Sequence, residues 1–281
     1  MTDIIAALLQ MFSFTFMVRA LVVGLMVSLC SALLGVSLVL KRYSMIGHGL
    51  SHVGFGALAV ATAFNAAPLL VSIPVTVIAA FLLLRLSESG LIKGDAAIAL
   101  ISASSIAIGV FVISVTTGMN TDVDNYLFGS ILALNQEDLV LSVILTAVVL
   151  VLFVFFYNKI FAITFDETFA RATGTRVDIY NSLLAVLIAL TIVVGMRMMG
   201  ALLISSLVIF PALSAMHTCR RFKTVTICAA VLSVVCFFIG LAISFLYATP
   251  TGASVVLVNL VAFSIFYLIG LSRGHLVKSR E

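Results

Sequence analysis

Two histidines four residues apart are the side chains of this sequence best suited to chemistry. His48 and His52 lie in an apolar stretch, 44-SMIGHGLSHVGFGALAVATAF-64. On a helix, residues i and i+4 share one face with their Cβ atoms about 5–6 Å apart, so both imidazoles can reach one cation through metal–nitrogen bonds of about 2.0–2.1 Å. Imidazole suits zinc and other late first-row metals better than calcium or magnesium. The pair supplies only part of the four-coordinate shell typical of zinc, so other ligands or water must complete it.

Two other interpretations of the pair follow from the same spacing. The imidazoles could be polar groups that link helices by hydrogen bonds, and His48 is near enough to the end of the stretch for its ring to reach water. A membrane metalloprotease is a third class of protein, but its helix carries H-E-x-x-H with the glutamate as general base. Gly49, Leu50 and Ser51 separate the two histidines here, which excludes that reaction.

The composition identifies the elements that must position the histidines. Of the 281 residues, 63% are hydrophobic and 9% are charged, and the mean hydropathy is +1.31. This is too little charge to cover a soluble domain. Apolar runs near twenty residues recur along the chain, and runs of that length span a bilayer as helices. An outer-membrane barrel would show alternating segments of about ten residues instead. We therefore predict an all-α, polytopic helical membrane protein.

The apolar runs predict about eight or nine transmembrane helices within a single transmembrane domain, residues 1–281. Four glycines near the histidines are expected to let neighbouring helices approach closely: Gly47, Gly49, Gly54 and Gly56. The expected helices are 15–40, 44–64, 68–86, 95–117, 138–157, 179–196, 198–216, 224–246 and 252–271.

The basic residues predict the orientation of the chain. Of the 15 Lys and Arg residues, all but Arg19 and Arg197 fall on one side of the predicted spans. The positive-inside rule makes that side cytoplasmic, so the N-terminus lies outside and the C-terminus inside. The net charge of +4 therefore reflects membrane orientation, and we expect no nucleic-acid partner. The four cysteines form no CxxC pair and are predicted to be free thiols: Cys30, Cys219, Cys228 and Cys236.

Two connections are longer than simple turns require. The first, 118–137, falls outside and carries Asp122 and Asp124, which could draw cations toward an entrance or could form an ordinary solvated turn or a protein contact. The second, about 158–178, falls in the cytoplasm. In the second connection Asp166 can cap a short helix and Glu167 lies in its first turn, where the helix dipole favours anions.

The run 47-GHGLSHVGFGALA-59 resembles the second-helix signature of permease subunits in bacterial ABC importers for zinc, manganese and iron. Further stretches agree in the same order, and the match covers residues from about 20 to 271. They are 122-DVDNYLFGSILALNQEDL-139, 165-FDETFARATGTRV-177, 199-MGALLISSLVIFPALSAM-216 and 249-TPTGASVVL-257. The family commonly has aspartate then histidine in the second helix, whereas this sequence has His48 at the aspartate position. Two imidazoles favour zinc over manganese, with iron third.

The resemblance implies a permease of the bacterial cell membrane that pairs as a homodimer or heterodimer. It implies that an extracellular solute-binding protein delivers Zn²⁺, Mn²⁺ or Fe²⁺ as cargo, with no permanently bound cofactor. It also implies that cytoplasmic ABC ATPase subunits use the ATP. This chain lacks G-x-x-x-x-G-K-[ST], so it is not itself expected to be an enzyme.

By the same resemblance, the cytoplasmic segment is the part that docks into the ATPase, whereas a plain amphipathic helix at the membrane surface is the other interpretation. The expected docking residues are Phe165, Asp166, Glu167, Phe169, Arg171, Gly174 and Arg176. Three other functions remain open. The same architecture could import a metal chelate, for which paired imidazoles have no clear use, or the protein could be a passive metal channel or a secondary transporter that needs no ATPase.

Overall fold

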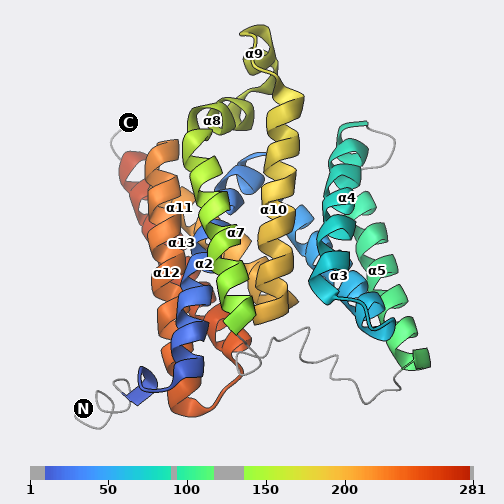
Figure 1. Cartoon of the computed structure of the whole chain (residues 1–281). Coiled ribbons are helices and arrows are strands. Elements are labelled where there is room, and N and C mark those ends of the chain that lie inside the picture. Colours follow the sequence, from blue (N-terminus) through green and yellow to red (C-terminus); the bar gives the residue numbers. More distant parts are fainter. Residues whose placement is uncertain (1–9, 90–93, 117–135, 279–281) are drawn as a thin grey trace.

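The computed structural model describes residues 10–89, 94–116 and 136–278, and these residues form a bundle of helices (Figure 1). No strand occurs within these ranges. The helices are α2 (Thr15–Leu40), α3 (Ser44–Ala63), α4 (Pro68–Ser89), α5 (Gly94–Thr116), α7 (Gln136–Phe155), α8 (Tyr157–Phe165), α9 (Glu167–Ala172), α10 (Val177–Met199), α11 (Ala201–Thr218), α12 (Phe222–Tyr247) and α13 (Thr251–Lys278).

Helix α2 lies at the centre of the bundle. Its most apolar part is 72% buried, against 17% for α13 at the periphery. It packs on α7, α10, α11 and α12. A Cβ atom added to Gly35 would lie 2.0 Å from the carbonyl oxygen of Val208 on α11, so glycine is needed for the close approach of these two helices.

Helices α3, α4 and α5 form a second group to one side of α10 (Figure 1). Helix α3 also contacts α10 and α11, and 13 of its 20 residues are buried. The helix that carries both histidines is thus held by protein on most of its circumference.

The described residues confirm a polytopic helical membrane protein. Seven helices are long and apolar enough to cross a membrane, and there are up to eight if Leu139–Phe155 and Tyr157–Phe165, which meet at 70°, form one broken span. Helix α3 is not among them, because its histidines, serines and glycines lower its hydropathy. A largely buried helix does not need a lipid-facing apolar surface.

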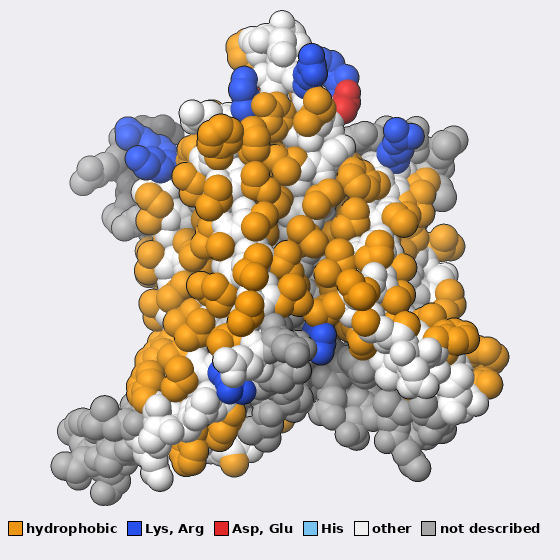
Figure 2. Space-filling model, in the orientation of Figure 1, with side chains coloured by type: hydrophobic (Ala, Val, Ile, Leu, Met, Phe, Trp, Pro, Cys, Tyr) orange, Lys and Arg blue, Asp and Glu red, His pale blue; other side chains and the backbone are white. Residues whose placement is uncertain are grey.

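The surface has the charge distribution of a membrane protein (Figure 2). Hydrophobic side chains cover the middle of this face, and Lys and Arg gather mainly at the end that carries α9. Basic residues at one end of a helical bundle are the pattern on which the positive-inside rule rests.

Two predictions differ from the structure by more than three residues. The connection predicted at about 158–178 contains a further helix, α8, before the expected short helix α9, and the last helix continues past residue 271 to Lys278. Asn158 and Lys159 interrupt the apolar run, yet α8 still buries Ile160 and Ile163 against neighbouring helices. Hydropathy alone reads such an amphipathic helix as a loop.

Candidate functional site

The two histidines of α3 lie against each other. Their Nε2 atoms are 3.1 Å apart, and the rings meet nearly at right angles with centroids 4.4 Å apart. Two nitrogens bonded to one tetrahedral ion at about 2.0–2.1 Å are separated by about 3.3–3.4 Å. The pair is therefore spaced to hold one ion after a small adjustment, and without an ion one neutral imidazole can donate a hydrogen bond to the other.

The pair lies at the surface of the chain. Met45 and His48 are exposed and His52 is half-buried, and these three positions form one stripe along α3. The cavity of about 180 Å³ between α3, α4 and α5 is lined mainly by valines and contains neither histidine. A cation could therefore reach the pair directly from the surface of this chain.

The two imidazoles are the only ligand-type side chains gathered at this point in the described residues. No group of three or more His, Cys, Asp or Glu residues able to hold a metal occurs in 10–89, 94–116 or 136–278. Within the same ranges, the buried Nδ1 atom of His52 has no hydrogen-bond partner. The described chain thus supplies an open, two-ligand site.

The four glycines of α3 differ in how closely neighbouring helices approach them. A Cβ atom on Gly56 would lie 2.6 Å from the backbone oxygen of Ser105 on α5. At Gly49 and Gly54 the nearest atoms, at 2.7 and 2.8 Å, are the side-chain ends of Ile98 and Met196. At Gly47 the nearest atom is 3.5 Å away, an ordinary contact. Of the four, only Gly56 lies directly against the backbone of another helix.

Ser51 lies between the histidines in sequence, and its hydroxyl lies close to α11. Its hydroxyl donates to the carbonyl oxygen of His48 at 2.7 Å and lies 3.3 Å from the Ser205 hydroxyl. Ser205 in turn donates to the carbonyl oxygen of Ala201. Each hydroxyl therefore donates its one proton within its own helix, so the contact between Ser51 and Ser205 is a close polar approach of α3 and α11 rather than a hydrogen bond.

The short helix α9 stands at the far end of the bundle, next to α10 (Figure 1). Asp166 is its N-cap, accepting a hydrogen bond from the Phe169 amide at 2.9 Å. Phe165 and Phe169 are 58% and 66% exposed, whereas Ala170 is buried with Ile163 and Val177. Phe165 is the last residue of α8 and Phe169 lies on α9, so exposed aromatic rings flank Asp166 and form a surface that another protein can cover.

The remaining predicted residues of this segment shape the turn into α10. Gly174 has a φ of +81°, which glycine adopts without strain. Arg176 is the N-cap residue of α10. Arg171 forms an exposed ion pair with Asp178, with Nη2 2.9 Å from Oδ1. The turn thus fixes how α9 leads into the start of α10.

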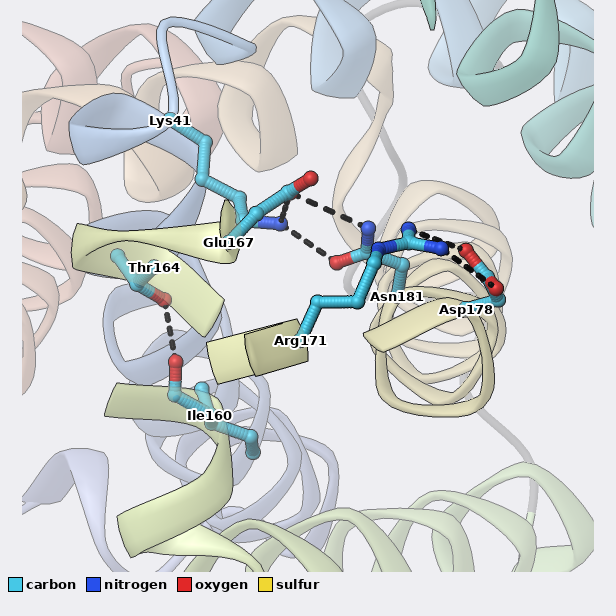
Figure 3. A network of polar contacts seen from close by, with 7 residues as sticks. All are labelled: Lys41, Ile160, Thr164, Glu167, Arg171, Asp178 and Asn181. Atoms are coloured by element: carbon cyan, nitrogen blue, oxygen red, sulfur yellow. Dashed lines mark hydrogen bonds and ion pairs between the residues drawn. The ribbon is translucent and has the colours of Figure 1, made fainter. Parts of the chain in front are cut away.

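Glu167 is held by two residues that the sequence analysis did not assign to this site (Figure 3). Lys41, which we used only to orient the chain, places Nζ 2.5 Å from Glu167 Oε1 and 2.5 Å from Asn181 Oδ1. Asn181 also donates from Nδ2 to Glu167 Oε1 at 3.2 Å. An asparagine inside an otherwise apolar run was a usable signal, because a buried amide needs partners.

Asp122 and Asp124, the predicted cation-attracting residues, lie outside the described residues. Their role stays a prediction. All four cysteines are free.

Removing the α9 cap should loosen that helix without affecting its neighbour. The Asp166→Ala substitution leaves the Phe169 amide without its side-chain acceptor, which costs about 1 kcal/mol. Hydrogen exchange of the α9 amides should therefore be about fivefold faster, while exchange in α10 stays unchanged. Equal exchange rates in wild type and variant would show that Asp166 does not stabilise α9.

Known proteins resemble this chain over nearly its whole length. The profile of the ABC 3 transport family matches residues 13–270. A Haemophilus influenzae protein named for an iron transport system is 30% identical, covering 98% of this chain and 97% of its own. The high-affinity zinc uptake system membrane protein ZnuB of the same species is 30% identical, and the match covers 89% of this chain and 96% of ZnuB. The manganese transport system membrane protein MntC of Halalkalibacterium halodurans is 26% identical, and the match covers 96% of this chain and 92% of MntC.

A solved structure agrees with these relatives. PsaBC from Streptococcus pneumoniae, solved in complex with Fab, has a chain that superposes with a TM-score of 0.83. It is 27% identical in sequence, and the match covers 95% of each chain.

Proposed function

The chain belongs to the ABC 3 transport family, and we propose that it is the permease subunit of an importer that carries Zn²⁺ into the cytoplasm. The relatives are named for zinc, manganese and iron, so the family alone leaves the metal open. The observation that favours zinc is the pair of imidazole nitrogens 3.1 Å apart on α3. Two neutral nitrogen ligands suit zinc better than manganese, which prefers oxygen ligands.

An incomplete site suits transport. A transported ion must bind well enough to enter and weakly enough to leave, and a closed four-ligand zinc site would retain it. His48 and His52 occupy two ligand positions. We propose that water or a second permease copy, facing the exposed stripe of α3, fills the others.

The energy for transport must come from another protein. The sequence has no phosphate-binding loop of the G-x-x-x-x-G-K-[ST] type. We assign α9 as the element that docks into a cytoplasmic ATPase, because it projects from the bundle, exposes Phe169 and follows the exposed Phe165 at the end of α8. Closure of the ATPase subunits would push on α9 and open the metal site toward the cytoplasm.

This assignment places the end that carries α9 in the cytoplasm, with the N-terminus outside and the C-terminus inside. The gathering of Lys and Arg at that end supports the orientation. An extracellular binding protein would deliver the ion at the opposite end, where Asp122 and Asp124 would draw it toward the dimer axis.

Uptake by the assembled transporter tests the proposal. The chain is reconstituted in liposomes with the ATPase that co-purifies with it, and uptake of Zn²⁺ is followed with ATP, without ATP and with competing Mn²⁺. We expect uptake that depends on ATP hydrolysis and that Mn²⁺ inhibits only in large excess. Uptake that continues without ATP would indicate a channel, and uptake of a chelated metal but not of the free ion would indicate a chelate importer.

A further inference from the structure

We propose that Lys41 is a positioning residue that transmits the movement of α9 to the histidine pair, through its contacts with Glu167 and Asn181. This inference rests on the proposed function, because it takes α9 as the ATPase-docking element. The Lys41 ammonium group, at the end of α2, contacts both α9 and α10 and would carry movement from one to the other.

The three side chains form a closed set of contacts (Figure 3). The ammonium group of Lys41 contacts Glu167 and Asn181, and the Asn181 amide donates to the same Glu167 oxygen. Glu167 is the first residue of α9, Asn181 lies on α10, and Lys41 is the C-cap residue of α2. Any displacement of α9 therefore acts on both transmembrane helices.

Burial makes this connection stiff. The Lys41 side chain is only 5% exposed and Asn181 is 4% exposed, whereas the Glu167 side chain is 38% exposed, so the ammonium group is the buried member of the pair. Beside them lies a cavity of about 20 Å³ lined mainly by leucine, isoleucine and alanine, large enough for about one water molecule. A buried ammonium that loses its carboxylate has nothing equivalent to replace it, so Lys41 must follow Glu167 when α9 moves.

The corner between α2 and α3 is built to pass on this movement. The Tyr43 amide donates to the Leu38 oxygen at 2.8 Å and the Arg42 amide to the Val39 oxygen at 3.0 Å, with Arg42 in the left-handed region at φ +63°. These are the two hydrogen bonds of a Schellman motif. Helix α3 begins at Ser44, so a rigid turn joins Lys41 to the helix that carries His48 and His52.

A second ion pair between α9 and α10 offers a matched control. Arg171 and Asp178 also join these helices, but their side chains are 61% and 77% exposed. Exposed pairs are screened by water and contribute little. The Asp178→Asn substitution removes this pair and leaves the Lys41 contacts intact.

The test compares metal uptake with ATP hydrolysis in proteoliposomes that contain the assembled transporter. Lys41→Met keeps the length of the side chain and removes its charge. We expect Zn²⁺ transported per ATP hydrolysed to fall about tenfold, with ATPase binding and hydrolysis retained, whereas Asp178→Asn changes this ratio less than about twofold. A merely structural role for Lys41 would lower uptake and hydrolysis together and leave their ratio unchanged.

A charge exchange makes the test specific. The double variant Lys41→Glu, Glu167→Lys reverses the pair, and the Asn181 amide can turn its other end to the new carboxylate. It should recover a higher ratio of uptake to hydrolysis than Lys41→Glu alone. Failure to recover would overturn the proposal.

A milder variant covers the case in which Lys41→Met does not assemble. Glu167→Gln keeps the hydrogen-bond acceptor and removes only the charge, and it should lower the same ratio about threefold. If Lys41→Met assembles, an unchanged ratio of Zn²⁺ transported to ATP hydrolysed would also overturn the proposal. If Lys41→Met does not assemble, an unchanged ratio in Glu167→Gln would overturn it. Absence of ATP-dependent Zn²⁺ uptake in wild type would instead refute the proposed function.

Discussion

Replacing His52 with alanine should reduce Zn²⁺ uptake by the assembled transporter at least tenfold. His52 is one of two imidazoles whose Nε2 atoms lie 3.1 Å apart, and its loss leaves a single protein nitrogen for the ion. Even indirect partners of a metal ligand change metal affinity by about 10–100-fold when removed, so loss of a direct ligand should have at least that effect. Initial rates of radioactive zinc uptake in proteoliposomes measure it.

Two further variants separate metal binding from general damage to α3. His48→Asp keeps one ligand at each position but adds an oxygen ligand and a negative charge, so the preference should shift from zinc toward manganese. Met45→Leu alters the same exposed stripe without removing an imidazole and should leave uptake and selectivity as in wild type. ATPase co-purification should be equal in all three variants.

Unchanged uptake and selectivity in both histidine variants would remove the pair from the transport path. The contact between Nε2 atoms would then be only a hydrogen bond within α3, which the geometry also permits. The metal path would have to follow other helices.

The sequence predicted the parts of this protein that depend on local patterns. The predicted helix 15–40 has the same first and last residues as α2. A long apolar run that crosses a bilayer must satisfy its backbone polar groups within the segment, which it does by forming a helix. The short helix capped by Asp166 also follows from local chemistry, since an aspartate three residues before a free amide is a strong N-cap.

The contacts that depend on distant residues were not predictable in this way. Lys41 and Glu167 are 126 positions apart in the sequence, and a lysine between two apolar segments is typical of a membrane boundary. The bend between α7 and α8 was missed for a related reason. Polar residues at 158 and 159 suggest a loop unless the neighbouring helices that bury α8 are known.

The glycines of α3 also could be interpreted only in part from the sequence. Four small residues near one another predict close helix packing, but not which of them is indispensable. Alanine at Gly56 places a methyl group 2.6 Å from the Ser105 oxygen, whereas at Gly47 the nearest atom is 3.5 Å away. The two substitutions are chemically identical, but only the one at Gly56 should lower the stability of the protein.

Gly56→Ala should lower the stability of the folded protein by about 1–3 kcal/mol, the usual effect of overpacking. The obstructing atom belongs to the backbone of α5, so relief requires the helix itself to move. The same face has no spare room, because a methyl group on Gly109 of α5 would lie 3.1 Å from the Gly56 Cα. Gly47→Ala meets no such obstacle and should be neutral or stabilising, since alanine favours a helix by about 1 kcal/mol over glycine.

Thermal unfolding in detergent, followed with a thiol-reactive fluorescent dye, can compare the two variants. The sequence has no tryptophan, but Cys30 and Cys236 are buried and free, so their labelling reports unfolding. The unfolding temperature should fall for Gly56→Ala and stay level or rise for Gly47→Ala. If both variants unfold at the wild-type temperature, α5 can shift away from α3 without loss. The histidine pair would then be carried by a helix held firmly only by α4, α10 and α11, and the close α3–α5 contact would not be what fixes the metal site.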